Sequence, residues 1–303
     1  MRSRAAVWRA ASDMPGAGNR ATMGHLRAMV PGMDSETLQY LFDLNGYVVI
    51  ENVLGSDEIA ALEAGIDAQE LEPPNPKFPR FGSAAGAVRA TGSGFLQYGQ
   101  PFVDLMDHEA VLPILRFRLG DFFRLERLYG IYQRQGMDKG VLHADYGASS
   151  PNSTAKRGEY YPFLDNRMTG GFCVAAWNLR DTGPGIGGFA CIPGSHKSQF
   201  RIPEGIHGDH QDGQWTQVLE APAGSVTLFT EAMTHGTSRW EASYERRTLL
   251  FKYCVSNMSW GATRVVAPDG LTLTPRQRQL LAEPGDPKVH FKSLFDEAGL
   301  EAG

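Results

Sequence analysis

Residues 224–255 read GSVTLFTEAMTHGTSRWEASYERRTLLFKYCV and contain two apolar segments, VTLFT and RTLLFKYCV. Valine, threonine and aromatic residues are enriched in strands, and the polar run between the segments is typical of a connection. The stretch therefore predicts two consecutive strands. His235, followed by Gly236, comes shortly after the first segment, and Arg246 stands at the start of the second.

The same pattern of short apolar segments begins upstream at Tyr129. Short β-type segments separated by glycine and proline read YGIYQRQ, GVLHADYG, GFCVAAWNL and GGFACIP. Strands at this spacing predict a pair of sheets, as in a sandwich or barrel, and not a parallel sheet that alternates with helices. We expect a mainly β fold whose core spans about residues 128–256, with flanking α-helices.

The flanking elements are predicted from helical spacing and capping signals. We expect a helix over 35–45 that stops at Asn45-Gly46, a strand over 47–54, a helix over 58–69, an irregular region over 70–100, a helix over 103–125, a strand over 128–134, and a short helix from Thr274 to about 282. Residues 34–303 are expected to form a single domain.

Residues 1–33 contain five arginines and one acidic residue. They lack the apolar core of a secretory signal and resemble a transit peptide, but a disordered or mis-assigned start is the preferred interpretation.

Composition excludes several classes of protein. The net charge of −5 and the pI near 5.9 give no reason to expect a nucleic-acid or anionic-membrane partner. Nothing approaches the roughly 20 continuous apolar residues of a membrane-spanning helix. Cys173, Cys191 and Cys254 lie in apolar runs without a C-x-x-C pair, so we expect buried thiols, a reducing compartment and a cytoplasmic location.

The segment VLHADYG places His143 and Asp145 two residues apart. On a strand the two side chains share one face, so two metal-ligand types would point the same way. A surface hydrogen-bonded pair fits the same letters, because chance supplies roughly one His-x-Asp/Glu match in such a chain. His207-Gly208-Asp209 is a second match, but it lies in a loop-like run.

Gly183–Gly188, GPGIGG, matches the G-x-G-x-x-G pattern of dinucleotide-binding turns. The residues that follow, FACIPGSHK, are β-like and broken by Pro193, whereas such a turn must open a helix. We therefore expect a tight connection between two strands.

His235 supplies a third ligand to the pair at 143 and 145. Two imidazoles and a carboxylate match the facial triad of non-haem Fe(II) oxygenases, although zinc hydrolases use similar ligands. Arg246 could place a guanidinium inward to pair with a carboxylate, while Arg247 would face the other way. Both arginines could equally form solvated pairs with Glu245.

Four stretches carry a resemblance to a known family: GYVVIENVLGSDEIAAL, HAD at 143–145, GGFACIPGSHKSQF at 187–200 and HGTSRWEASYERR at 235–247. From about Leu38 to Val255 the chain resembles the phytanoyl-CoA dioxygenase family of Fe(II)/2-oxoglutarate-dependent oxygenases. The resemblance implies a double-stranded β-helix, also called a jelly-roll or cupin-like core. It implies Fe(II) held by His143, Asp145 and His235, and Arg246 pairing with 2-oxoglutarate.

The resemblance also implies weaker assignments. Thr237 would lie near the same carboxylate, Trp177 would pack beside the cosubstrate, and His196 would be a structural turn histidine. The expected reaction uses O2 and 2-oxoglutarate to hydroxylate a C–H bond, with release of succinate and CO2. Asp145 favours hydroxylation over halogenation, while desaturation, cyclisation and epoxidation stay open.

The expected substrate is a small molecule, such as an acyl-CoA, an amino acid or a natural product. Residues 147–170 could act as a lid over it, and residues 76–98, with Lys77 and Arg80, could line the other side. Two alternatives stay open. One is a catalytically silent barrel that binds a small molecule, and the other is a Zn- or Mn-dependent lyase or isomerase, which needs no Arg246.

Overall fold

The structure is a computed structural model that describes residues 34–77, 79–85, 92–144, 161–164, 167–168, 171–198, 200–208, 214–259, 261 and 263–301. Its centre is a six-stranded antiparallel sheet of order β1-β9-β6-β11-β3-β2. In chain order these strands are β1 (Tyr47–Ile50), β2 (Arg80–Ala84), β3 (Phe123–Gln133), β6 (Phe172–Asn178), β9 (Val226–Thr230) and β11 (Arg246–Val255). The C-terminal strand β11 thus lies in the middle of the sheet, between β6 and β3.

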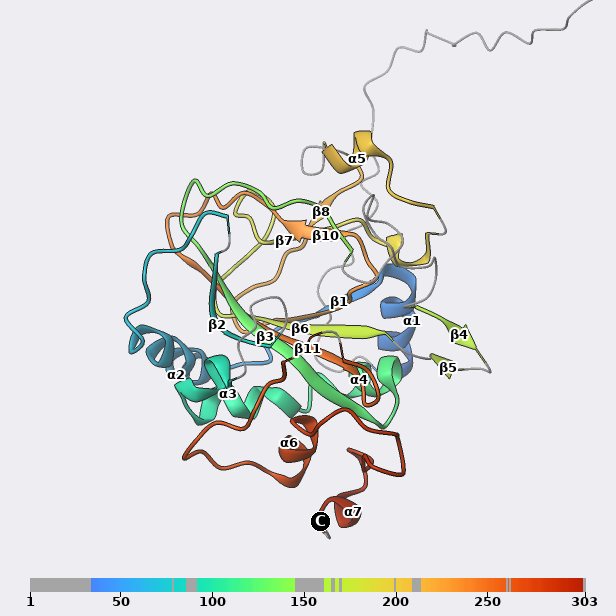
Figure 1. Ribbon diagram of the computed structural model, residues 1–303. Helices are drawn as coiled ribbons and strands as arrows, with labels where there is room; N and C mark the ends of the chain where they lie inside the picture. Colours follow the sequence, from blue (N-terminus) through green and yellow to red (C-terminus); the bar gives the residue numbers. More distant parts are fainter. Residues whose placement is uncertain are drawn as a thin grey trace, which may run out of the picture.

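A smaller sheet faces the large one across the interior (Figure 1). It has the order β10-β7-β8, formed by β10 (His235–Thr237), β7 (Phe189–Cys191) and β8 (Gln217–Val218). A single antiparallel bridge between His143 and His235 adds the segment around His143 beside β10. A short hairpin of β4 (Phe163–Leu164) and β5 (Arg167–Met168) lies apart. Two facing antiparallel sheets confirm the predicted sheet pair.

Helices cover the face of the large sheet that points away from the small one (Figure 1). They are α1 (Ser35–Asn45), α2 (Ser56–Asp67), α3 (Gln100–Asp104), α4 (Leu112–Leu119) and α6 (Pro275–Leu280), with the 3₁₀ turns η1 (Gly94–Tyr98) and η2 (Leu105–Asp107) between them. The turn η3 (Ser195–Lys197) and the short helices α5 (Glu204–Gly208) and α7 (Glu297–Glu301) complete the described elements.

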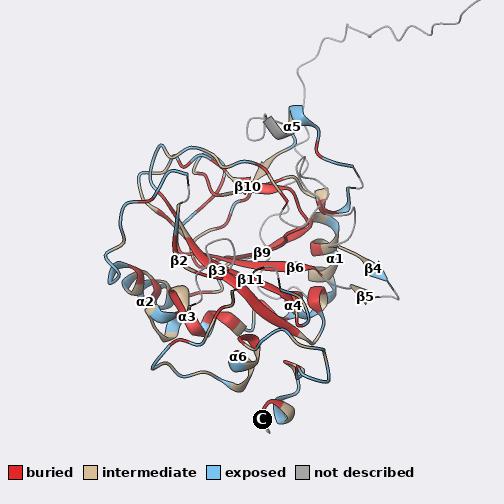
Figure 2. Ribbon diagram, in the orientation of Figure 1, coloured by how far each residue is buried: buried red, intermediate tan, exposed pale blue. Residues whose placement is uncertain are grey.

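The strands of the large sheet are largely buried (Figure 2), and the alternation of side chains along them separates the core into two parts. On β6, Cys173, Ala175 and Trp177 face the helices and join the larger apolar cluster. Val174 and Ala176 face the small sheet and join a second cluster with Tyr129 and Phe229. The two faces of one strand therefore serve different compartments, and only the second compartment contains the cavity described below.

The predicted helix over 103–125 is wrong. The region breaks into α3, η2 and α4, because Pro101 and Pro113 each start a new helix and Gly120, at φ 77°, ends α4. Strand β3 then begins at Phe123, five residues before the predicted strand. The first part of this strand was not predicted because it contains the charged residues Arg124 and Glu126. Both side chains are nevertheless buried, with 1% of their surface exposed. Likewise, β2 forms inside the region that was predicted to be irregular, and β1 ends at Ile50, before the predicted 54.

Several local predictions are confirmed. Helix α1 ends at Gly46, whose φ of 85° is left-handed, and the Thr274 hydroxyl accepts from the Gln277 amide to cap α6. The 183–188 glycines form a tight turn closed by a Gly187 N to Gly183 O hydrogen bond of 2.8 Å, with no helix after it. The three cysteines are free and buried. Within the described ranges, no helix has the length and apolar character needed to cross a bilayer. Residues 1–33 lie outside the described residues.

Candidate metal and cosubstrate site

His143 and His235 lie side by side on neighbouring segments of the small sheet. Each backbone amide donates to the carbonyl of the other residue at 2.8 Å, which fixes the two segments in register. The ring centroids are 4.6 Å apart. Two residues that are 92 positions apart in the chain therefore present their imidazoles together, as the sequence predicted.

The hydrogen bonds of the two rings decide which nitrogen can bind a metal. His143 Nδ1 lies 2.9 Å from the Val141 carbonyl oxygen, and His235 Nδ1 lies 2.8 Å from that of Met233. A carbonyl oxygen can only accept, so Nδ1 carries the proton in both rings and Nε2 carries the lone pair. Backbone carbonyls that hold Nδ1–H in this way are typical of metal-binding histidines. The pair fits a metal that is coordinated through Nε2.

Asp145, the third predicted ligand, lies outside the described residues, as does the lid predicted over 147–170 apart from short pieces near its end. Among the described residues, no group of three His, Cys, Asp or Glu side chains could hold a metal. The described residues therefore contain two of the three predicted ligands, His143 and His235. The competing motif at 207–209 begins at the end of helix α5, and its Asp209 is not described.

A cavity of about 500 Å³ opens between the two sheets and includes both histidines. Apolar side chains form much of its wall, among them Phe189, Phe229 and Leu250. The rings of Phe189 and Phe229 lie 5.6 Å and 4.9 Å from the His235 ring, centroid to centroid. The volume suits a small organic ligand, and a mainly apolar lining with a few polar groups is typical of such sites.

Arg246 projects into this cavity from the first position of β11, opposite Gln133 on β3. Its side chain is almost fully buried, and burial lowers its pKa to about 10. Nη1 donates to Gln133 Oε1 at 2.8 Å, and Nε donates to Thr248 Oγ1 at 3.1 Å. Neither partner is charged, and no described carboxylate lies within ion-pair distance of the guanidinium.

The neutral partners belong to a chain of polar groups across the sheet. The Thr248 hydroxyl donates to Asn178 Oδ1 at 3.2 Å, and Asn178 Nδ2 donates weakly to Thr227 Oγ1 at 3.5 Å. The hydrogen bonds that the guanidinium donates to neutral groups fix it in place without cancelling its charge. A buried cation that is oriented but not neutralised favours the binding of an anion, and a guanidinium can hold a carboxylate with two parallel hydrogen bonds.

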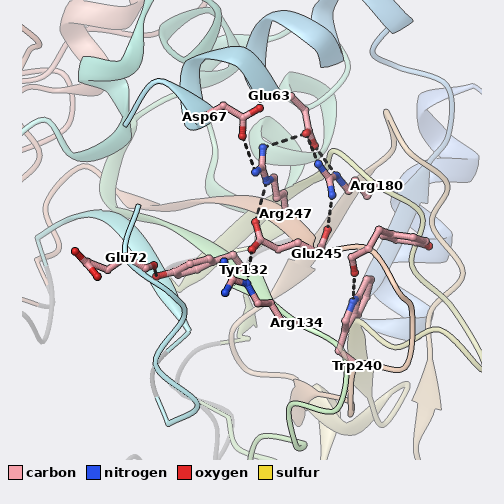
Figure 3. A network of polar contacts seen from close by, with 10 residues as sticks. Glu63, Asp67, Glu72, Tyr132, Arg134, Arg180, Trp240, Glu245 and Arg247 are labelled. Atoms are coloured by element: carbon pink, nitrogen blue, oxygen red, sulfur yellow. Dashed lines mark hydrogen bonds and ion pairs between the residues drawn. The ribbon is translucent and has the colours of Figure 1, made fainter. Parts of the chain in front are cut away.

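The neighbouring Arg247 has the opposite surroundings (Figure 3). Its guanidinium contacts Glu63 at 3.0 Å, Asp67 at 2.7 Å and Glu245 at 3.1 Å. Burial opposes its charge, but these three carboxylates together raise the pKa of Arg247 above its usual value. The prediction that the two arginines face opposite sides is confirmed, and the pair with Glu245 belongs to Arg247.

Of the two weaker assignments, Thr237 lines the cavity and Trp177 does not. Thr237 lies on β10 and lines the cavity together with Arg246. Trp177 is fully buried on the helix side of β6, with its ring 5.2 Å from that of His108. The prediction that Trp177 packs beside the cosubstrate is therefore wrong. Its neighbour Ala176 lines the cavity instead, because side chains alternate along a strand.

His196 is a buried structural residue, as predicted. Its Nε2 lies 3.0 Å from the Asp43 carbonyl oxygen, and its ring packs on Tyr161 at 4.4 Å between centroids. A side chain at position 46 would collide with the ring, so Gly46 serves this contact as well as the end of α1. Burial lowers the pKa of His196 to about 4, which keeps it neutral.

Sequence reasoning missed Gln133 and Thr248, the two direct partners of Arg246. Thr248 could have been found by alternation, since residues 246 and 248 share one face of a strand. Gln133 carries no such signal, because its position opposite Arg246 depends on the pairing of β3 with β11.

Comparisons with known proteins identify similar folds. The chain resembles the structure of HygX from Streptomyces hygroscopicus with nickel and 2-oxoglutarate bound, with 21% identity, 75% of this chain and 89% of that chain covered, and a TM-score of 0.60. HygX with nickel, 2-oxoglutarate and hygromycin B matches at 23% identity, with the same coverage and a TM-score of 0.59. AviO1 from Streptomyces viridochromogenes Tue57 matches at 16% identity, with 77% and 100% covered and a TM-score of 0.53.

These structural matches show the fold, and they confirm the predicted jelly-roll core with flanking helices. No curated protein matches the chain in sequence. A family model does match: the one described as phytanoyl-CoA dioxygenase (PhyH) covers residues 42–248, which is more than half of the chain and includes positions 143, 235 and 246. The chain therefore belongs to the phytanoyl-CoA dioxygenase family.

Proposed function

We propose that the protein is an Fe(II)/2-oxoglutarate-dependent dioxygenase that hydroxylates a C–H bond of a small molecule. The observation that carries the proposal is the shared cavity, in which the His143–His235 pair and a buried arginine without a carboxylate partner among the described residues meet. Family membership supports it. So do the HygX structures, which hold iron, or nickel with 2-oxoglutarate, in a similar fold.

His143 and His235 would hold Fe(II) through Nε2, and Asp145 would supply the carboxylate. Two neutral imidazoles and one carboxylate leave the ion with a net charge near +1 and with open positions for a chelating ligand. When bound, Fe(II) and 2-oxoglutarate supply the oxidation: O2 converts the keto acid to succinate and CO2, and oxygen enters the substrate.

Arg246 would bind the distal carboxylate of 2-oxoglutarate, with Thr237 donating a hydroxyl hydrogen bond to the same group. Gln133 and Thr248 hold the guanidinium in one orientation before the anion arrives, so little order has to be created on binding. The rings of Phe189 and Phe229 pack against His235, which is buried, and shield that ring from bulk water. This lowers the local dielectric and strengthens the arginine–carboxylate pairing.

The same cavity supports the expectation of a small-molecule substrate, and a HygX structure holds hygromycin B beside 2-oxoglutarate. A silent binding barrel and a Zn- or Mn-dependent lyase or isomerase remain the alternatives. The lyase or isomerase gives no reason for a buried guanidinium held by neutral partners, and the histidine pair beside that guanidinium favours the oxygenase over a silent barrel.

The test is to add Fe(II) and 2-oxoglutarate to the protein without oxygen. The expected result is the weak visible charge-transfer band of the iron chelate, followed by slow succinate release when oxygen is admitted. His235→Ala should give neither signal. Absence of both the band and the succinate in the unaltered protein would favour the binding or lyase alternatives.

A further inference from the structure

The lining of the cavity is positively charged. Its described part carries four cationic side chains and one carboxylate, namely Lys77, Arg80, Lys139 and Arg246 against Asp138. The whole chain has the opposite balance, with 34 acidic and 29 basic residues. Cations are therefore concentrated in the lining of this cavity, against the overall composition of the protein.

Arg80 has a defined position in this lining. It starts the edge strand β2 and pairs with Ile131 of β3, which in turn pairs with Thr248 of β11. All three residues line the cavity. Its guanidinium carbon lies 4.2 Å from the centroid of the Tyr129 ring. The ring is buried, so the guanidinium stacks on a rigid platform while its edge stays exposed.

Neither Arg80 nor Lys77 has a carboxylate within ion-pair distance among the described residues. Other arginines of the described chain show that partners are readily found: Arg116, Arg134 and Arg247 all lie against carboxylates. Stacking on an aromatic ring orients the charge of Arg80 and leaves its hydrogen-bond donors for another group.

The proposed cosubstrate does not neutralise these cations. Fe(II), one carboxylate ligand, the 2-oxoglutarate dianion and Arg246 together carry no net charge. No described carboxylate therefore compensates Arg80 or Lys77 when the cosubstrate is bound. Between them and the histidines the wall is apolar, with Ile131, Phe189, Phe229 and Leu250.

We propose that the substrate carries an anionic group, a carboxylate or a phosphate, on an apolar body, and that Arg80, assisted by Lys77, binds this group at the cavity mouth. The proposal rests on the proposed function for the position of the reacting carbon. The planar guanidinium fits an oxyanion with two hydrogen bonds, and the apolar wall directs the body of the molecule toward the metal ligands.

The experiment measures binding to the full chain loaded with Ni(II) and saturating 2-oxoglutarate, so that Arg246 is occupied. The probes are octanoate, octyl phosphate and the neutral octanamide, titrated by calorimetry. We expect at least one of the two anions to bind at least about tenfold more tightly than octanamide, because a hydrogen bond between charged groups is about twice as strong as a neutral one. This preference should shrink at high salt.

Arg80→Gln should lower the affinity for the anionic probes about tenfold and leave the affinities for octanamide and 2-oxoglutarate unchanged. Arg80→Lys should recover part of the loss, since it keeps the charge but not the planar fork. Lys77→Gln should have a smaller effect because its side chain is exposed. Arg116→Gln, on the far side of the sheet, is the matched control and should change none of these affinities.

Two results would overturn the proposal: equal affinity for octanoate, octyl phosphate and octanamide, including no binding of any of them, or full anion affinity in Arg80→Gln. The outcome is independent of the proposed function. If 2-oxoglutarate binds and the anionic probes do not, only the substrate class is wrong. If the probes bind through Arg80 and the iron chelate never forms, only the oxygenase assignment is wrong.

Discussion

The two faces of the large sheet are made from the same strands but have different contents. The helix-covered face is filled with aromatic and aliphatic side chains, and at its edge Arg247 is neutralised by three carboxylates. The face toward the small sheet has a cavity, and there Arg246 meets only neutral partners. One face uses charge to stabilise the fold, and the other keeps a charge available for a ligand.

The difference shows how one strand can serve both purposes. Alternation along β11 sends adjacent residues of the same type to opposite faces, so a change of one position in register would exchange their roles. A buried charge without an oppositely charged partner costs stability, and a bound anion would return part of that cost. Substitutions on the two faces should therefore separate effects on binding from effects on folding.

The largest expected effect is on the metal. His235→Ala removes one of two imidazoles that are held by backbone carbonyls, so Fe(II) binding and Fe(II)-dependent succinate release should fall below detection. Metal content after dialysis and a succinate assay measure this. His196→Gln is the matched control and should keep full metal content, since His196 lies outside the cavity lining. Normal metal content in His235→Ala would contradict the site.

The arginine pair gives the next effect. Arg246→Gln should weaken 2-oxoglutarate binding by roughly 10- to 100-fold, from the loss of about 1.5–3 kcal/mol of charge-assisted hydrogen bonding. Arg247→Gln should leave that affinity unchanged and instead lower the free energy of unfolding by about 1–2 kcal/mol, because its carboxylate partners lose their cation. Calorimetric titration and urea unfolding separate the two. Equal loss of cosubstrate affinity in both variants would remove the distinction between the faces.

Trp177 tests the helix-covered face. Trp177→Leu should lower the free energy of unfolding by about 2–4 kcal/mol, since it leaves a void against His108 in a fully buried position. The affinity for 2-oxoglutarate should not change, because Ala176, and not Trp177, lines the cavity. A variant with normal stability and weakened cosubstrate binding would restore the role that the sequence suggested.

A further effect concerns pH. The pKa of His196 is about 4 in the folded state, below the ordinary value of 6.5, because burial disfavours the charged ring. Between pH 6.5 and 4 the unfolded chain takes up a proton that the folded chain does not. The free energy of unfolding should therefore fall as the pH falls through this window, by up to about 3 kcal/mol.

Urea unfolding at pH 7 and pH 5 measures this loss, and His196→Gln should reduce it, since glutamine does not titrate. If the variant and the unaltered protein lose stability in parallel over this range, other groups account for the acid sensitivity.

Much of the fold could be predicted from local signals. Helix α1 with its Gly46 end, the capped helix α6 and the strand segments around β6, β7, β9 and β11 follow from alternation and capping, which act over a few residues. The break-up of residues 103–125 and the first, charged part of β3, before residue 128, were missed. Arg124 and Glu126 are buried there by contacts with distant segments, such as the Arg124 hydrogen bond to the Ala282 carbonyl. Local composition does not contain that information.

The amino-acid sequence was enough to identify the two histidines and Arg246 as candidates for the site and to place Arg247 on the opposite face. Their surroundings follow from the fold, because the pairing of β3 with β11 brings Gln133 to Arg246 and the pairing at 143 and 235 sets the two rings together. The fold also decided that Trp177 faces the helices and that Arg80 stacks on Tyr129 at the cavity mouth. The physical reason is that charge, burial and partner depend on contacts between strands far apart in the chain, while periodicity depends only on neighbours.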